Sequence, residues 1–232
     1  MRVELKRAIY EENDALALRI HEELAERGIF TVNVLGSPGA GKTSLITRLA
    51  EALASDGGKP VGFAVIEGDV ASDIDTVALR ALGIDAYQIE TGGDCHLNAP
   101  MIRAVLSRMR IADGSWLFIE NIGNLICPAE FVIGEDLKLV VASVAEGSDK
   151  PYKYPTAFAR SAACVLTKID IAEPIGFDEV FFRAGLNSVA PNAPLFPVNG
   201  RSGQGIDALA AWLRTARAQA QGAAPLSSAP RD

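Results

Sequence analysis

The feature that most constrains this chain is the stretch Gly36-Ser37-Pro38-Gly39-Ala40-Gly41-Lys42-Thr43, which fits the pattern G-x-x-x-x-G-K-S/T. Glycine at positions 39 and 41 lets the backbone curl where a β-carbon would clash, so that several N–H groups can point at one phosphate. The apolar run 30–35 before the stretch predicts a buried strand, and residues 44–53 after it predict a helix. In this context the pattern indicates a phosphate-binding loop (P-loop) rather than a surface turn.

Each residue of this loop receives an expected role. Residues Gly36 to Ser44 are expected to bind the phosphates of a nucleotide, mainly through backbone N–H groups. Lys42 is expected to reach the β- and γ-phosphates, and Thr43 to offer its hydroxyl to Mg²⁺.

The remaining chain alternates between strand and helix patterns. Short apolar runs predict seven strands, at 30–35, 61–66, 86–89, 116–119, 137–143, 163–167 and 195–198. Helical patterns fall between them, and an amphipathic helix at 13–27 precedes the first. This alternation predicts an α/β fold with a doubly wound, mainly parallel sheet of about seven strands, and ligands beyond the carboxyl ends of the strands.

Three regions are expected along the chain. Residues 1–28 form a helical segment packed on a nucleotide-binding domain at 29–221. Residues 222–232 form an Ala/Pro/Ser-rich tail that is expected to be disordered.

Composition excludes several classes of protein. The net charge of −7 and the lack of a long basic run argue against nucleic acid as a main partner. No apolar run is long enough to span a membrane, and the first residues lack the apolar core of a secretory signal. Three cysteines in 232 residues are not a disulfide framework. We therefore expect a cytoplasmic protein without a membrane partner.

The stretch Thr167-Lys168-Ile169-Asp170 has the form N/T-K-x-D and follows the sixth predicted strand. A carboxylate at Asp170 can accept hydrogen bonds from guanine N1–H and its 2-amino group, whereas it would face a lone pair on adenine N1. The pattern therefore favours GTP over ATP. Asn199, after the seventh strand, is the expected second contact to the base.

Two further strand ends carry carboxylates, in Glu67-Gly68-Asp69 and in Glu120-Asn121-Ile122-Gly123. Because Mg²⁺ prefers oxygen ligands, Thr43, Asp69 and Glu120 are the expected magnesium-site residues. Lys42, Asp69 and Glu120 are the expected catalytic residues. The stretch 120–123 has the form of the D-x-x-G switch element of GTPases, except that Glu120 replaces the usual aspartate. As an alternative, Glu120 could only cap the end of the strand.

Cys95, His96 and Cys127 lie in two loops that both follow predicted strands. Thiolate and imidazole ligands suit Zn²⁺ or Ni²⁺, and three ligands leave a coordination site open. From spacing alone, buried structural cysteines remain an alternative. Cys164 lies inside an apolar strand and is expected to be a small core residue.

These stretches together resemble the HypB family of GTPases, which assist nickel insertion into nickel–iron hydrogenases. The match is carried by the P-loop, by 65–69, by Thr91-Gly92-Gly93-Asp94-Cys95-His96-Leu97, by 120–125 and by 167–170. The resemblance implies a SIMIBI-class domain, slow GTP hydrolysis, and GTP-dependent homodimerisation. It also implies a Ni²⁺ or Zn²⁺ site at the dimer interface, with Cys95, His96 and Cys127 as ligands. The implied partners are a HypA-type metallochaperone and, indirectly, the hydrogenase large-subunit precursor.

Other interpretations remain open at this point. A urease-type nickel GTPase similar to UreG is the nearest alternative, although its loop typically has Cys-Pro-His where cysteine and histidine are adjacent here. A small-molecule P-loop kinase would prefer ATP, and a metal-storage protein would bind metal without nucleotide dependence. Lys150 or Lys153 could reach a phosphate in a partner subunit. The stretch 120–123 is expected to act as a switch whose position depends on the bound nucleotide. Because Cys127 lies four residues beyond Gly123, movement of this switch should also move a metal ligand.

Overall fold

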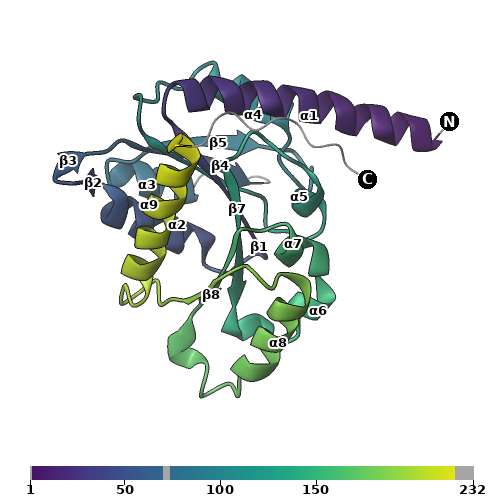
Figure 1. Ribbon diagram of the computed structural model, residues 1–232, viewed down its shortest axis with the longest axis vertical. Helices are drawn as coiled ribbons and strands as arrows, with labels where there is room; N and C mark the ends of the chain where they lie inside the picture. The colour runs from purple at the N-terminus through teal and green to yellow at the C-terminus, as the bar shows by residue number, and fades with distance from the viewer. Residues whose placement is uncertain (1, 70–73, 223–232) are drawn as a thin grey trace.

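The computed structural model describes residues 2–69 and 74–222, and within them a seven-stranded, fully parallel sheet forms the centre of the molecule (Figure 1). The strand order across the sheet is β5-β4-β6-β1-β7-β8-β9. The strands are β1 (Phe30–Gly36), β4 (Phe63–Asp69), β5 (Asp85–Glu90), β6 (Trp116–Glu120), β7 (Leu137–Ser143), β8 (Ala163–Thr167) and β9 (Leu195–Pro197). Because all seven run in the same direction, their carboxyl ends share one edge of the sheet.

Helices follow most of the strands and cover both faces of the sheet. The α-helices are α1 (Arg2–Glu26), α2 (Lys42–Leu53), α3 (Ile74–Ala81), α4 (Ala99–Leu106), α5 (Cys127–Glu130), α6 (Lys150–Lys153), α7 (Pro155–Ala159), α8 (Glu179–Val189) and α9 (Ile206–Gly222). Two 3₁₀ turns, η1 (Val144–Glu146) and η2 (Ile169–Ile171), follow β7 and β8. A small antiparallel hairpin, β2 (Ser55–Asp56) and β3 (Lys59–Pro60), projects beside α2.

Alternate strand residues point to opposite faces, which divides the core into two layers. On one face, Phe118 and its neighbours pack with buried residues of α2, α3 and α9. On the other face, Leu117 and Ile119 pack with α1 and α4, while Val140 and Leu166 pack with α7 and α8. The sheet is therefore covered on both sides, which explains why its central strands are rich in buried apolar residues, whereas the edge strand β5 has Asp85 and Glu90 exposed at its ends.

The predicted α/β fold with a seven-stranded parallel sheet is confirmed. The predicted start of the first helix is wrong, because α1 begins at Arg2 rather than near Asn13. The residues before Asn13 include Glu, Leu, Lys, Arg and Ala, whose helix propensity extends the helix beyond the amphipathic stripe. Residues 57–60, between α2 and β4, form part of the β2–β3 hairpin.

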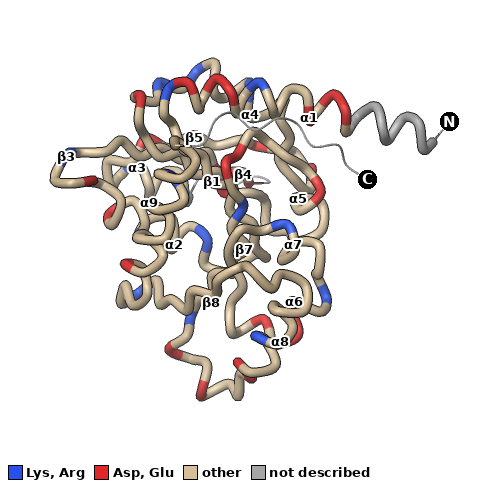
Figure 2. The backbone as a smooth tube through the Cα atoms, viewed as in Figure 1, with Lys and Arg blue, Asp and Glu red and all other residues tan. Residues whose placement is uncertain are grey.

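Over residues 10–26 of α1, which Figure 2 colours, acidic residues outnumber basic ones. Among the described residues, no helix combines the length and the hydropathy that a membrane span requires. The expected tail, apart from Gly222, lies outside the described residues.

Candidate active site and metal centre

The P-loop joins β1 to α2 at the carboxyl edge of the sheet. Gly39 and Gly41 have φ angles of 72° and 91°, a region that favours glycine, as the motif predicts. The hydroxyl of Thr167, at the end of β8, donates a 2.6 Å hydrogen bond to the carbonyl of Ala40. The loop is thus held by a neighbouring strand in a curled conformation that suits a phosphate.

Lys42, Thr43 and Glu120 meet at the centre of this edge. The ammonium group of Lys42 lies 3.6 Å from Glu120 Oε1 and 3.4 Å from the carbonyl of Ser37. The hydroxyl of Thr43 donates to the same Glu120 oxygen at 3.2 Å. Lys42 and Glu120 are each only 7 % exposed. The structure therefore brings together three of the four residues expected to act on the phosphates or Mg²⁺.

Asp69, the fourth, is the last residue of β4, the strand next to β6. Glu67 on the same strand lies beside Glu120 in the sheet register, is buried, and accepts a hydrogen bond from the hydroxyl of Thr76. Sequence reasoning placed Glu67 in the acidic stretch without giving it a role. The sequence did contain a signal that could have identified Glu67 as a site residue, because it lies at the end of a buried strand and two residues before Asp69.

The loop after β8 packs directly on the P-loop. Lys168 has a left-handed φ of 59°, and its ammonium group donates to the carbonyl of Gly39 at 2.7 Å. Asp170 follows in η2. The side-chain oxygen of Asn199 accepts from the backbone N–H groups of Arg201 and Ser202 at 2.8 and 3.2 Å, so it shapes its own loop.

Of the two lysines considered for the phosphates, only Lys150 contacts the P-loop of its own chain. Its ammonium group donates to the hydroxyl of Ser37 at 3.1 Å and pairs with Glu146 at 3.0 Å. Lys153 instead forms an exposed pair with Asp149, and this hydrogen bond raises the lysine pKa.

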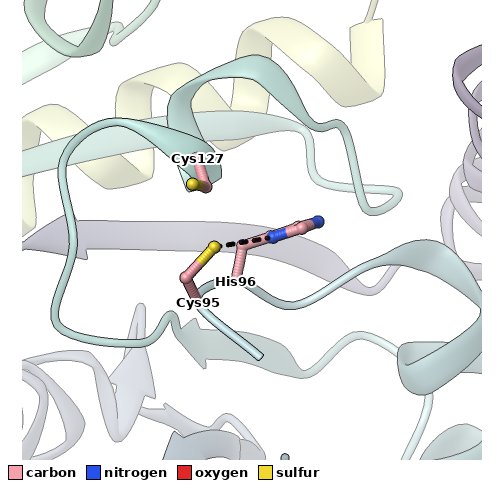
Figure 3. Close-up of side chains that lie close together, drawn as sticks. All are labelled: Cys95, His96 and Cys127. Carbon is pink, nitrogen blue, oxygen red and sulfur yellow. Dashed lines mark hydrogen bonds between the residues drawn. The ribbon is translucent and has the colours of Figure 1, made fainter. Parts of the chain in front are cut away.

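Cys95, His96 and Cys127 form a compact cluster (Figure 3). One ligand atom from each residue can be chosen so that all three lie within 4.8 Å of one another. Cys95 Sγ lies 3.5 Å from His96 Nδ1. The imidazole stacks on the ring of Phe131 with 4.0 Å between centroids, which fixes its plane. The two loops that were predicted to meet are therefore adjacent.

The surroundings shift the pKa of two members of the cluster, Cys95 and His96. A hydrogen bond with Cys127, followed by burial, raises the pKa of the Cys95 thiol. Burial lowers the pKa of His96, which favours the neutral, metal-binding form of the imidazole. Cys164 lies fully buried in β8, where burial raises the pKa of its thiol, as expected for an inert core residue.

The switch loop, residues 120–124, lies between the P-loop and the cysteine cluster. The backbone of Asn124 forms an isolated β-bridge with Gly36, and its amide donates to the carbonyl of Cys95 at 3.2 Å. A β-carbon on Gly123 would lie 2.9 Å from the nitrogen of Pro38, which shows how closely this loop approaches the P-loop.

Asn121 makes a second link between the switch loop and the cluster. It is 1 % exposed, and its side-chain oxygen accepts from the N–H of Leu97, the residue after His96, at 3.1 Å. Sequence reasoning gave neither Asn121 nor Asn124 a role, although both belong to the stretch that begins at Glu120.

Comparison with known proteins identifies the family. The sequence model of the CobW/HypB/UreG nucleotide-binding domain matches residues 30–196. Hydrogenase maturation factor HypB of Rhizobium leguminosarum bv. viciae is 39 % identical over 217 residues, which cover 94 % of this chain and 71 % of that protein. The chain belongs to the HypB family. The resemblance predicted from the sequence is thereby confirmed, and with it the prediction that this chain is a P-loop GTPase.

Two solved HypB structures share this architecture. HypB from Archaeoglobus fulgidus superposes with a TM-score of 0.81 at 36 % identity, covering 89 % of this chain and 99 % of that one. HypB from Helicobacter pylori, solved in complex with nickel, gives a TM-score of 0.82 at 32 % identity, covering 90 % and 96 %.

Proposed function

We propose that this HypB-family GTPase carries nickel during hydrogenase maturation and uses GTP to control its release. The observation that carries the proposal is the position of Asn124, which pairs with Gly36 of the P-loop and donates to the carbonyl of Cys95. Because one short loop contacts both the nucleotide site and the Cys/His cluster, nucleotide binding can change metal affinity, and metal binding can change nucleotide affinity. The relatives' names and the nickel complex of the Helicobacter pylori protein support the choice of cargo.

In this proposal the P-loop residues Gly36 to Ser44 hold the phosphates of GTP through their N–H groups. A bound Mg²⁺ would supply positive charge that offsets the negative charge of the phosphates. The chemistry of the donors fits that ion, since Thr43 offers a hydroxyl and Glu120 and Asp69 offer carboxylates. Thr43 would hold the metal directly. Glu120 and Asp69 would hold its waters or orient the attacking water, while Lys42 would stabilise the charge that develops on the phosphate.

Asp170, Lys168 and Asn199 form the proposed base site. The Lys168 bond to Gly39 fixes the base loop relative to the phosphate loop, so that Asp170 is set at a defined distance from the phosphates. Asn199 contributes by shaping the loop that closes the base site. This loop lies against Ser44 through Gly200.

Replacing Asp170 with asparagine should lower GTP affinity about 10- to 100-fold, because a charged acceptor of two hydrogen bonds is lost. Xanthine has a carbonyl where guanine has the 2-amino group, so the new amide N–H should improve binding of xanthosine triphosphate. Competition titrations with both nucleotides measure this exchange. Asp113→Asn, on an exposed carboxylate, is the matched control and should change neither affinity. Unchanged GTP affinity in D170N would contradict the base site.

The cargo site consists of Cys95, His96 and Cys127. These three donors from one chain leave a four-coordinate ion open, and a second copy of the chain can complete the shell. We therefore place the nickel or zinc site at the interface of a GTP-dependent homodimer. Metal content and light-scattering mass are measured together, with GDP and with a non-hydrolysable GTP analogue. A protein that stays monomeric and binds nickel equally well with GDP and with the GTP analogue would contradict a metal site at the dimer interface.

The proposed partners are a HypA-type metallochaperone and, indirectly, the hydrogenase large-subunit precursor, in the cytoplasm. The proposed organisation has the helical segment 1–28 packed on a GTPase domain at 29–221, followed by the tail 222–232. The contacts of α1 with α4 and β1 support the packing of the first segment.

The switch loop should make nickel affinity depend on the nucleotide. We expect the nickel Kd to differ at least about fivefold between GDP and the GTP analogue, within the usual range for coupled sites. Asn124→Ala removes the side-chain bond to Cys95 but retains the backbone bridge, so the ratio should fall below about twofold. Asn192→Ala, at an exposed loop asparagine, should keep the wild-type ratio. Equal affinities in the two states of the wild type would rule out the coupling.

A further inference from the structure

The N-terminal helix α1 reaches the metal cluster through a side chain that the function described above does not use. Asn13 lies in the interior of this helix, is only 4 % exposed, and points into the protein. Asparagine is a poor residue for a helix interior unless its polar atoms find partners. Its partners therefore indicate what it does.

Asn13 bonds to both segments that carry the metal ligands. Its side-chain oxygen accepts from the N–H of Ala99 at 2.9 Å, and Ala99 begins α4 three residues after His96. Its amide nitrogen donates to the carbonyl of Val132 at 2.8 Å, five residues after Cys127. One buried side chain thus joins the Cys95–His96 loop to the segment that follows α5.

Tyr10, three residues earlier on α1, makes a parallel pair of contacts on the Cys127 side. Its hydroxyl donates to Glu130 Oε2 at 2.8 Å, and Glu130 is the last residue of α5, which begins at Cys127. The centroid of its ring lies 4.8 Å from that of Phe131, and the Phe131 ring also stacks on the imidazole of His96. Figure 1 shows the corresponding arrangement, with α1 lying along α4 and extending past α5.

Among the described residues, no single helix or strand carries all three ligands of the cluster. Cys95 and His96 lie in the loop before α4, and Cys127 begins α5, which is a single turn, so the distance between the two segments depends on contacts made by other elements. The bonds of Asn124 and Asn121 tie these loops to the nucleotide side, whereas Asn13 and Tyr10 tie them to a long helix on the other side. Residues that orient metal ligands in this way usually affect metal affinity strongly.

We propose that Asn13 and Tyr10, here called the α1 clasp, are positioning residues that hold the Cys95–His96 loop and the Cys127 segment at the separation a metal ion needs. This inference rests on the proposed nickel function and names residues outside the ligand set. It makes α1 part of the metal site, so that any displacement of this helix would lower the affinity for the metal ion.

The first test measures nickel affinity by competition with a chromophoric chelator, and follows the thiolate-to-nickel absorption band. Asn13→Ala should weaken nickel binding about 10- to 100-fold and reduce that band, while GTP hydrolysis stays within about twofold. Tyr10→Ala, at a partly exposed position where folding is less at risk, should weaken binding about tenfold, and Tyr10→Phe should retain most of the affinity through its ring. Nickel affinity within twofold of wild type in both alanine variants would overturn the clasp.

Two controls separate positioning from general destabilisation. Asn98→Ala removes the side-chain cap of α4, which accepts from Met101 N at 3.0 Å, but breaks no bond to the Cys127 segment. Leu209→Ala opens a cavity under α9 on the opposite face of the sheet. Both should lower the melting temperature and leave nickel affinity within about threefold. Losses as large as that of Asn13→Ala would assign the effect to stability and overturn the proposal.

A second readout needs no metal. Dibromobimane bridges two neighbouring thiols and becomes fluorescent, so it reports the approach of Cys95 to Cys127 in the apo protein, while Cys164 stays buried. Asn13→Ala should slow bridging at least about fivefold relative to wild type, and an unchanged rate would overturn the clasp. If dibromobimane bridges the two thiols of the wild type but the protein binds no nickel, the proposed function fails. The bridging rates of the variants would still show whether Asn13 and Tyr10 hold the two segments together.

Discussion

Replacing Lys42 with methionine should reduce the rate of GTP hydrolysis about 100- to 1,000-fold. The ammonium group of Lys42 lies in a buried position at 3.6 Å from Glu120, where a positive charge acts on the phosphates with little screening by water. Loss of one such preorganised group typically costs about 3–4 kcal/mol of transition-state stabilisation. Methionine retains an unbranched stem, which matters because the lysine stem lies against Gly36.

The measurement is single-turnover hydrolysis of GTP at saturating Mg²⁺, which separates the chemical step from nucleotide binding. Lys59→Met, at an exposed lysine of the β2–β3 hairpin, is the matched control and should keep the wild-type rate within about twofold. A K42M protein that folds, binds GTP and retains more than a tenth of the wild-type rate would show that Lys42 has no catalytic role.

The parts of this structure that sequence reasoning predicted share a physical cause. Parallel strands covered on both faces are rich in apolar residues, so each left a short readable run in the sequence, even the edge strand β5 with its run at 86–89. The P-loop glycines were readable because a left-handed backbone at Gly39 and Gly41 leaves few other choices of residue. Cys95, His96 and Cys127 were readable as ligand types, and the prediction that all strand carboxyl ends share one edge placed their loops on the same side of the sheet.

The residues that sequence reasoning missed are single polar side chains whose partners are remote in the chain. Asn13 binds backbone atoms at positions 99 and 132, and no local pattern distinguishes it from an exposed helical asparagine. Asn121 bonds to Leu97 and to Asn33, a contact that only the packed sheet reveals. Lys150 was considered for a phosphate in another subunit, yet its described contact is with Ser37 of its own P-loop. Such contacts depend on which loops meet, and this is decided by packing.

Removing Cys127 should abolish tight nickel binding while leaving the nucleotide site working. In Cys127→Ala we expect the nickel Kd to rise more than about 100-fold, because loss of a direct ligand exceeds the usual effect of an outer residue. GTP hydrolysis should stay within about threefold, since the thiol lies beyond the switch loop and the P-loop contacts of Gly123 and Asn124 remain. Cys95→Ala should give the same loss, because its thiol occupies the same cluster.

Cys164→Ala is the control that separates ligand loss from thiol loss in general. This thiol is fully buried in β8, and its raised pKa keeps it protonated, so its removal should cost about 1 kcal/mol of stability and no nickel affinity. Metal analysis of the GTP-loaded wild type beside the three variants gives the decisive comparison. Full nickel occupancy in C95A and C127A would require ligands elsewhere in the chain. In that case the bonds that the switch loop makes to Cys95 and Leu97 would not lead to a bound metal, and the proposed control of nickel by GTP would fail.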